Sequence, residues 1–186
     1  FFLIVRRPPR STPLQTLFPY SALCRSDVVA RRAGVPPIGL RTLRRTAALA
    51  VAPDGLDGWP LVMAVGGQWY AAPEPGGLLI SPADETPVEP GDVGADELDV
   101  AMAIDRVNDA LGVGIRSIRR AWAGVRTFCP DRRPSVGVDP DHPGFVWLVG
   151  QGGGGIKTAP AMAALTASIV LDGAAPPRDL DPTRWR

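Results

Sequence analysis

The segment that most constrains the fold lies in the last quarter of the chain, where an apolar run leads through glycines into an alanine-rich stretch. Residues 145–149 have the length and composition of a buried strand. Five of the six residues 150–155 are glycine. Residues 156–171 then read as a helix, which Gly173 and the prolines after it close. The sequence therefore predicts a strand, a glycine loop and a helix in direct succession.

This glycine loop is suited to binding a polarised or anionic group. Glycine lets backbone N–H groups approach a ligand closely, and the start of a helix carries about half a positive charge. Gly150, Gly152 and Gly155 formally satisfy the pattern GxGxxG, but a dinucleotide site also needs a second strand followed by an acidic residue. Only fifteen residues follow Leu171, and Ile156 interrupts a P-loop pattern. A glycine-rich turn for tight strand–helix packing is the alternative.

The rest of the chain favours an α+β fold around a mostly antiparallel sheet. The amphipathic stretch 96–111 predicts a helix, with Leu98, Ala101, Met102 and Leu111 near its apolar face. Residues 82–94 form an acidic, proline-rich loop, and Pro53-Asp54-Gly55 is typical of a turn. A further helix ends near residue 33. Strands are expected at 40–50, 60–65, 68–72, 77–81, 115–128 (bent near Gly124), 134–138 and 145–149.

Composition and charge exclude several classes of protein. Hydrophobic residues make up 45% and charged residues 21%, which is ordinary globular usage. Two cysteines and one histidine support neither a disulfide framework nor a histidine-based metal site, so no metal is expected. Residues 1–50 carry a net charge of +8, residues 51–113 of −11 and residues 114–186 of +4. Because basic and aromatic residues do not alternate, nucleic acid is not expected as a partner. No apolar run is long enough to span a membrane, and we expect a cytoplasmic protein.

Residues 1–26 show neither a helical nor a strand period, and four prolines interrupt them. One interpretation is a native basic tail. The other is an artefactual leader, because the stretch resembles the translation of sequencing-adapter read-through. We expect this segment to pack poorly, and a first residue that is Phe rather than Met suggests a truncated chain. The match is carried by Phe1, Phe2, Arg6, Arg7, Pro8, Pro9, Arg10, Ser11, Thr12, Leu17, Phe18, Pro19 and Tyr20.

Several motifs in the second half of the chain occur in one order. Trp122, Gly124, Arg126 and Phe128 form W-A-G-x-R-x-F, and P-x-x-G and P-G-F-x-W follow. G-Q-G-G-x-G-I-x-T-A-P-A then begins at Gly150. Together with residues 33–46 and 77–90, these motifs resemble the C-terminal signature of the D-amino acid oxidase family of FAD-dependent oxidoreductases. That family includes glycine and sarcosine oxidases and D-amino acid dehydrogenases.

The resemblance covers residues 27–173 and implies a domain organisation. In this family the dinucleotide fingerprint lies near the N-terminus, so the chain resembles the C-terminal half of a flavoenzyme without its N-terminal Rossmann part. The expected parts are a leader (1–26), a remnant of the FAD-binding domain (27–39), a substrate-binding domain (40–128), the last strand and C-terminal helix of the FAD-binding domain (129–173) and a tail (174–186).

The resemblance also implies site residues. Arg126 occupies the position of an arginine that pairs with the substrate carboxylate, and the Tyr70 hydroxyl reaches the same carboxylate. A surface arginine and an aromatic partner of Trp69 are the respective alternatives. The loop that would wrap the pyrimidine side of the flavin consists of Gly150, Gln151, Gly152, Gly153, Gly154, Gly155, Ile156, Lys157 and Thr158.

This sequence departs from the family pattern at three of these positions. Gly154 replaces a tyrosine that contacts substrate, which puts specificity in doubt, and Ala72 replaces a basic residue. Lys157 replaces a glutamine, and its side chain either adds a cation near the reduced flavin or points to solvent. His142 is expected in a loop, and Cys129 has no base nearby in sequence that would activate it.

The implied activity is oxidation of the amine of an amino acid by hydride transfer to FAD, which gives an imino acid. Oxygen or a quinone would reoxidise the flavin. No acid–base residue is assigned, since none is needed if the amine binds unprotonated. The chain alone is expected to be inactive. A non-catalytic binding or assembly module that keeps the fold without flavin is the competing hypothesis, and the oligomeric state stays open.

Overall fold

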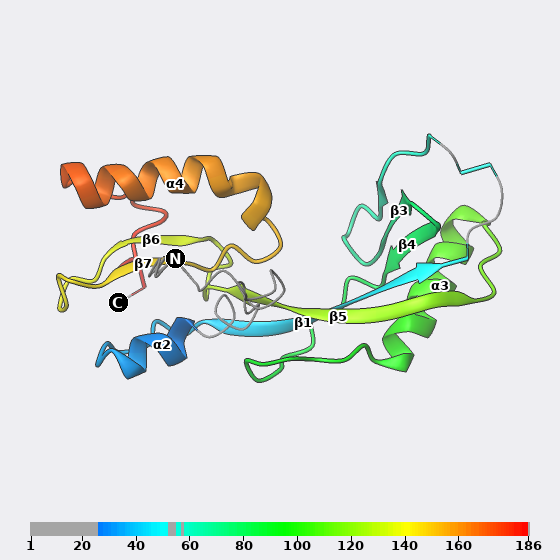
Figure 1. Cartoon of the computed structure of the whole chain (residues 1–186), viewed down its shortest axis with the longest axis horizontal. Helices are drawn as coiled ribbons and strands as arrows, with labels where there is room; N and C mark the ends of the chain where they lie inside the picture. Colours follow the sequence, from blue (N-terminus) through cyan, green and yellow to red (C-terminus); the bar gives the residue numbers. More distant parts are fainter. Residues whose placement is uncertain (1–25, 52–54, 57, 186) are drawn as a thin grey trace, which may run out of the picture. The chain divides into compact units, whose positions relative to one another are not determined.

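The computed structural model describes residues 26–51, 55–56 and 58–185 (Figure 1). The expected leader lies outside these residues apart from Ser26, and of the expected turn at 53–55 only Gly55 is described. The chain forms two compact units. Unit 1 comprises the described residues of Phe1–Thr42, Glu89–Gly91 and Arg126–Arg186, and unit 2 comprises those of Leu43–Val88 and Asp92–Val125. No helix within the described ranges is both long and apolar enough to cross a membrane.

Five strands form one sheet in the order β2-β3-β4-β1-β5. Neighbouring strands run antiparallel where their register is defined, with Ala71 opposite Ile80 and Ala48 opposite Ile80 on the other side. The prediction of an α+β fold with a mostly antiparallel sheet is confirmed. The strands are β1 (Arg41–Ala50), β2 (Val62–Met63), β3 (Tyr70–Glu74), β4 (Gly77–Ser81) and β5 (Ile118–Phe128).

Helix α3 (Glu97–Leu111) covers this sheet in unit 2. The Asp96 carboxylate accepts the N–H of Leu98 at 2.9 Å, and Gly112 ends the helix with a φ of 64°. Asp and Gly are preferred at these two positions, and the helix was predicted at 96–111. Val100, Ala103 and Val107 are buried against Leu78, Ile80 and other apolar residues of the sheet.

The predicted apolar face of α3 is wrong in part. Leu98 is 77% exposed and Met102 38%, whereas Asp99 is buried together with Val100, Ala103 and Val107. Asp99 turns inward because Nη2 of Arg44 lies 2.7 Å from its Oδ2 and the Thr46 hydroxyl lies 3.2 Å away. A buried carboxylate is tolerated only with such partners. The ion pair therefore helps to determine which side of α3 faces the sheet. The pattern of apolar residues alone predicts a different side.

Unit 1 is built around the hairpin of β6 (Ser135–Val138) and β7 (Val146–Val149). Helix α2 (Ser26–Arg32) lies on one face of the hairpin and α4 (Gly155–Asp172) on the other (Figure 1). Apolar side chains fill both interfaces, with Ala30 beside Trp147 on one side and Val136 beside Met162 on the other. The predicted strand–glycine loop–helix succession is confirmed.

The chain after α4 folds back onto β6. The N–H of Val136 donates to the carbonyl of Leu180 at 2.8 Å. Arg184 donates from Nε and Nη2 to the two carboxylate oxygens of Asp131, at 2.7 and 2.8 Å. These hydrogen bonds from the Arg184 guanidinium hold the pKa of Asp131 at about 2, below its ordinary value of 3.8. The last residues are thus tied to unit 1 by a charged pair.

This pair predicts a component of acid sensitivity. A carboxylate whose pKa is lowered by folding stabilises the protein above its unfolded pKa, and this contribution is lost as the pH falls from about 4 to about 2. Because the Asp131 side chain is 38% exposed, the contribution at pH 7 is expected to be about 1 kcal/mol or less. Asp131→Asn should lower the urea midpoint at pH 7, and the difference should shrink below pH 4 and vanish below about pH 2.

Asp179→Asn is the matched control, since Asp179 pairs with Arg133 while 71% exposed. Its urea midpoint should stay close to that of the wild type. An Asp131→Asn variant with the same midpoint as Asp179→Asn at pH 7 would show that the Arg184 pair adds nothing measurable.

Candidate active-site loop

The glycine loop lies against the end of β5. The N–H of Gly152 donates to the carbonyl of Thr127 at 2.9 Å, and Phe128 and Gln151 form an antiparallel bridge. Both contacts lie within unit 1. They hold the loop beside Arg126, which directly precedes Thr127 in β5. The resemblance implied site roles for both the loop and Arg126, and the fold brings the two together.

Two of the loop glycines are required by the packing. Gly150 and Gly152 have φ values of 74° and 53°, in the left-handed region that favours glycine. A Cβ atom on Gly150 would collide with Sγ of Cys129, and one on Gly152 with the ring of Phe128. The Phe128 ring thus packs directly against Gly152 of the loop. In the sequence Phe128 stands out only as part of a motif, and the second glycine of G-Q-G is the one signal that a neighbour packs closely there.

Gly152→Ala is therefore expected to lower the free energy of unfolding of unit 1 by about 2–4 kcal/mol, because strain at positive φ and overpacking add. Gly154→Ala is the matched control in the same loop. Gly154 has a φ of −100°, and a Cβ there would meet only the flexible Cε of Lys157, at 3.2 Å. Urea denaturation followed by tryptophan fluorescence measures both. Equal midpoints for the two variants would contradict the role of the Phe128 contact.

The guanidinium of Arg126 lies directly on Gly153. A Cβ atom built on Gly153 would be 2.5 Å from Nη1 and 2.9 Å from Cζ of Arg126. Arg126 is half-buried, and its side chain makes no hydrogen bond or ion pair with any residue that the structure describes. A side chain at 153 would displace the guanidinium from this position. A planar guanidinium with open donors is suited to a carboxylate.

The start of α4 adds further donors beside Arg126. Gly154 precedes the helix without a capping side chain, and Thr158 donates from its N–H (3.0 Å) and hydroxyl (2.9 Å) back to the Gly154 carbonyl. Across the described part of the chain, the amides of Gly155, Ile156 and Lys157 have no acceptor, and Lys157 has no ion-pair partner. The loop therefore presents positive potential and open N–H groups, which suit an anion or a polar ring edge.

Two other predicted residues have structural positions in unit 1. Cys129 is 1% exposed, and burial raises the pKa of its thiol to about 11, as expected for an unreactive cysteine. His142 lies in the loop between β6 and β7, as predicted, with Nδ1 at 3.0 Å from the Asp139 carboxylate.

Tyr70 belongs to unit 2. It lies half-buried in β3, opposite Met63 and Ser81 in the neighbouring strands. Ala72 is in the same strand. The contact of Tyr70 with a substrate carboxylate stays a prediction.

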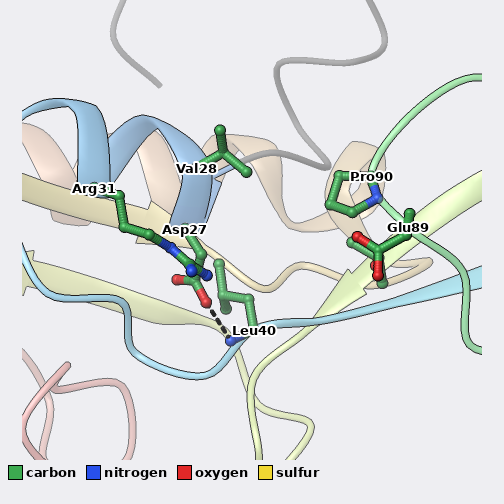
Figure 2. Close-up of a pocket in the computed structure, with 7 residues that line it drawn as sticks. Asp27, Val28, Arg31, Leu40, Glu89 and Pro90 are labelled. Carbon is green, nitrogen blue, oxygen red and sulfur yellow. Dashed lines mark hydrogen bonds between the residues drawn. The ribbon is translucent and has the colours of Figure 1, made fainter.

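A pocket of about 440 Å³ in unit 1 was not anticipated (Figure 2). Asp27 has a structural role at its edge, because its carboxylate accepts the N–H groups of Ile38 (3.2 Å) and Leu40 (2.9 Å). Residues 89–90 meet two segments near residues 27–42 in this pocket, so no local pattern could reveal it. The lining mixes charges of both signs with apolar groups, and it singles out no ligand. It consists of Asp27, Val28, Arg31, Leu40, Thr42, Glu89 and Pro90.

Comparison with known families places the chain in one of them. The sequence pattern of the family described as FAD dependent oxidoreductase matches residues 23–169, most of the chain. The chain belongs to this family. FAD is therefore the cofactor of its family. The predicted resemblance to the D-amino acid oxidase family is confirmed.

Several solved structures share the fold. L-proline dehydrogenase from P. horikoshii superposes with a TM-score of 0.74 at 20% identity, over 87% of this chain and 45% of its own. Glycine oxidase from Geobacillus kaustophilus gives 0.65 at 20% identity, over 82% and 40%. L-amino acid deaminase from Proteus vulgaris gives 0.67 at 14% identity, over 87% and 50%. The chain thus spans half or less of the length of these proteins.

The loop residues of this chain fit the polar edge of a flavin. The pyrimidine ring of flavin presents acceptor oxygens and nitrogens, which match the open amides of Gly155, Ile156 and Lys157. Gly153 is exposed and has no side chain in front of its backbone. These residues would hold the pyrimidine side of the cofactor, with Arg126 next to it.

Proposed function

We propose that the chain is the C-terminal part of an FAD-dependent enzyme that oxidises the amine of an amino acid to an imine. The observation that carries the proposal is the half-buried Arg126 guanidinium, which lies on Gly153 of the flavin loop without a protein acceptor among the described residues. The related structures are named for their action on proline, glycine and L-amino acids. Every such substrate carries an α-carboxylate, the group that an open guanidinium binds best.

Each residue of the site has a role in this proposal. Arg126 binds the substrate carboxylate in a bidentate manner and thereby orients the α-carbon towards the loop. The amides of the loop residues 150–158 bind the pyrimidine side of the cofactor and stabilise negative charge there. FAD, when bound, supplies the hydride acceptor. No side chain needs to remove a proton if the amine binds unprotonated, and the imine then hydrolyses in water.

The two units correspond to two functions in this proposal. Unit 1 belongs to the flavin-binding domain, and unit 2 belongs to the substrate-binding domain. The family resemblance alone assigns the Tyr70 hydroxyl to the substrate carboxylate. The substrate is of the D-amino acid, glycine or sarcosine type. The side chain of Lys157 lies next to Gly154: a Cβ atom built on Gly154 would be 3.2 Å from Cε of Lys157. Lys157 thus occupies space that a larger residue at 154 would take. Oxygen or a quinone is the final electron acceptor.

The test uses the flavin-loaded protein that contains this chain, kept without oxygen. Oxidised flavins absorb at about 450 nm, and addition of glycine, sarcosine or D-amino acids should bleach this absorbance. The 186-residue chain alone should not catalyse the reaction. A protein that binds no flavin, or whose flavin no amine bleaches, would instead support a non-catalytic binding module.

A further inference from the structure

Arg184 lies in the segment that follows α4, yet its side chain is only 9% exposed. Besides its two hydrogen bonds to the Asp131 carboxylate, Nη1 donates to the carbonyl of Asp181 and Nη2 to that of Arg133, both at 2.9 Å. A guanidinium presents its N–H donors in a rigid plane, so these acceptors hold it in one orientation. Arg184 therefore links the segment after α4 to residues 129–133, which we call the β5–β6 turn.

The residues where β5 leads into this turn contact the glycine loop. The ring of Phe128, the last residue of β5, packs against Gly152, and Sγ of Cys129 packs against Gly150. A Cβ atom on either glycine would collide with these side chains, so the packing leaves no slack. A shift of the β5–β6 turn would therefore reach the backbone of the loop directly.

Arg132, in the β5–β6 turn, has a strained backbone. Its φ is 65°, in the left-handed region that residues other than glycine adopt uncommonly, and such strain persists only where the surrounding structure holds it. Arg184 binds the residues directly before and after Arg132, through the carboxylate of one and the carbonyl of the other. The Arg132 guanidinium lies 4.2 Å from the centre of the Phe128 ring, in a cation–π contact. The strained residue thus connects Arg184 with the ring that packs against the loop.

We propose that Arg184 is a positioning residue for the glycine loop and, through the loop, for the flavin. Without its guanidinium the turn relaxes at Arg132, and the Phe128 ring no longer fixes Gly152. The amides of residues 155–157 follow the loop, so negative charge on the reduced flavin would lose part of its stabilisation. The step from the loop to the flavin rests on the proposed function, whereas the step from Arg184 to the loop does not.

Amide hydrogen exchange of the flavin-free 186-residue chain tests the first step. Arg184→Met removes the guanidinium but keeps most of the aliphatic stem. It should raise the exchange rate of the Gly152 N–H, which donates to the Thr127 carbonyl, about ten-fold. Arg184→Lys should recover only part of the protection, because an ammonium cannot form the planar fork.

Two controls separate positioning from a general loss of stability. The helical N–H of Ile169, buried in the same unit, should rise by a much smaller factor than that of Gly152. Arg178→Met makes the same change at an exposed arginine of the same segment and should leave the Gly152 rate at the wild-type value.

The flavin-loaded protein that contains this chain tests the second step. Equilibration with a reference dye measures how readily the flavin accepts electrons, and Arg184→Met should lower this equilibrium constant about three- to ten-fold. Arg178→Met should leave it unchanged. An unchanged Gly152 exchange rate in Arg184→Met, or an equal rise at Gly152 and Ile169, would overturn the proposal. Faster exchange at Gly152 with an unchanged flavin equilibrium would overturn the second step, and with it the proposed contact between the loop and the flavin.

Discussion

Arg126→Ala is expected to lower kcat/KM for amino acids by about 30- to 1,000-fold in the flavin-loaded protein, the equivalent of about 2–4 kcal/mol. The loss follows because the substrate carboxylate would enter a half-buried site without its cationic partner. Most of the effect should appear in KM, since the guanidinium binds the carboxylate in the ground state as well as in the transition state. Steady-state kinetics with a good amino-acid substrate measure it.

Two further variants make this result specific. Arg126→Lys keeps the charge but cannot form the planar fork, so it should recover only part of the loss. Arg133→Ala removes a different unit 1 arginine, whose side chain is 59% exposed and paired with Asp179, and should leave kcat/KM unchanged. If Arg126→Ala left KM and kcat at the wild-type values, Arg126 would not be the carboxylate partner.

The largest expected effect on stability comes from Asp139, which lies under the loop between β6 and β7. Its carboxylate is fully buried and accepts the indole N–H of Trp147 at 2.9 Å. It also accepts the backbone N–H groups of Asp141 and His142, both at 3.1 Å. Asp139→Ala leaves the indole N–H of Trp147 unpaired in the core and takes the acceptor away from the two loop N–H groups, and it should lower the free energy of unfolding of unit 1 by about 3–5 kcal/mol.

Urea denaturation followed by tryptophan fluorescence, to which the buried Trp147 contributes, measures this change. Asp139→Asn keeps one acceptor oxygen and should fall between the wild type and Asp139→Ala. Asp179→Ala removes an exposed ion pair and should cost about 1 kcal/mol or less. If Asp139→Ala and Asp179→Ala lost the same stability, the hydrogen bonds to Trp147 and the loop would not support the unit.

The contrast between α3 and α4 shows where sequence patterns suffice. Both helices begin and end within a residue or two of their predicted limits, because caps, glycines and periodicity act over a few neighbouring residues. The buried face of α3 was misjudged because Asp99 pairs with Arg44, more than fifty residues away in the chain. Hydrophobicity along the helix contains no information about that partner.

For the candidate site too, some features can be predicted from the sequence and others only from the structure. The glycine run before a helix, the motif around Arg126 and the family resemblance can all be read along the chain, and they determine the strand–loop–helix succession and the class of cofactor. The position of the Arg126 guanidinium on Gly153, and of the Phe128 ring beneath Gly152, was decided only by the tertiary structure. Such contacts depend on how β5 packs against the loop, and short-range chemistry along the backbone cannot specify that packing.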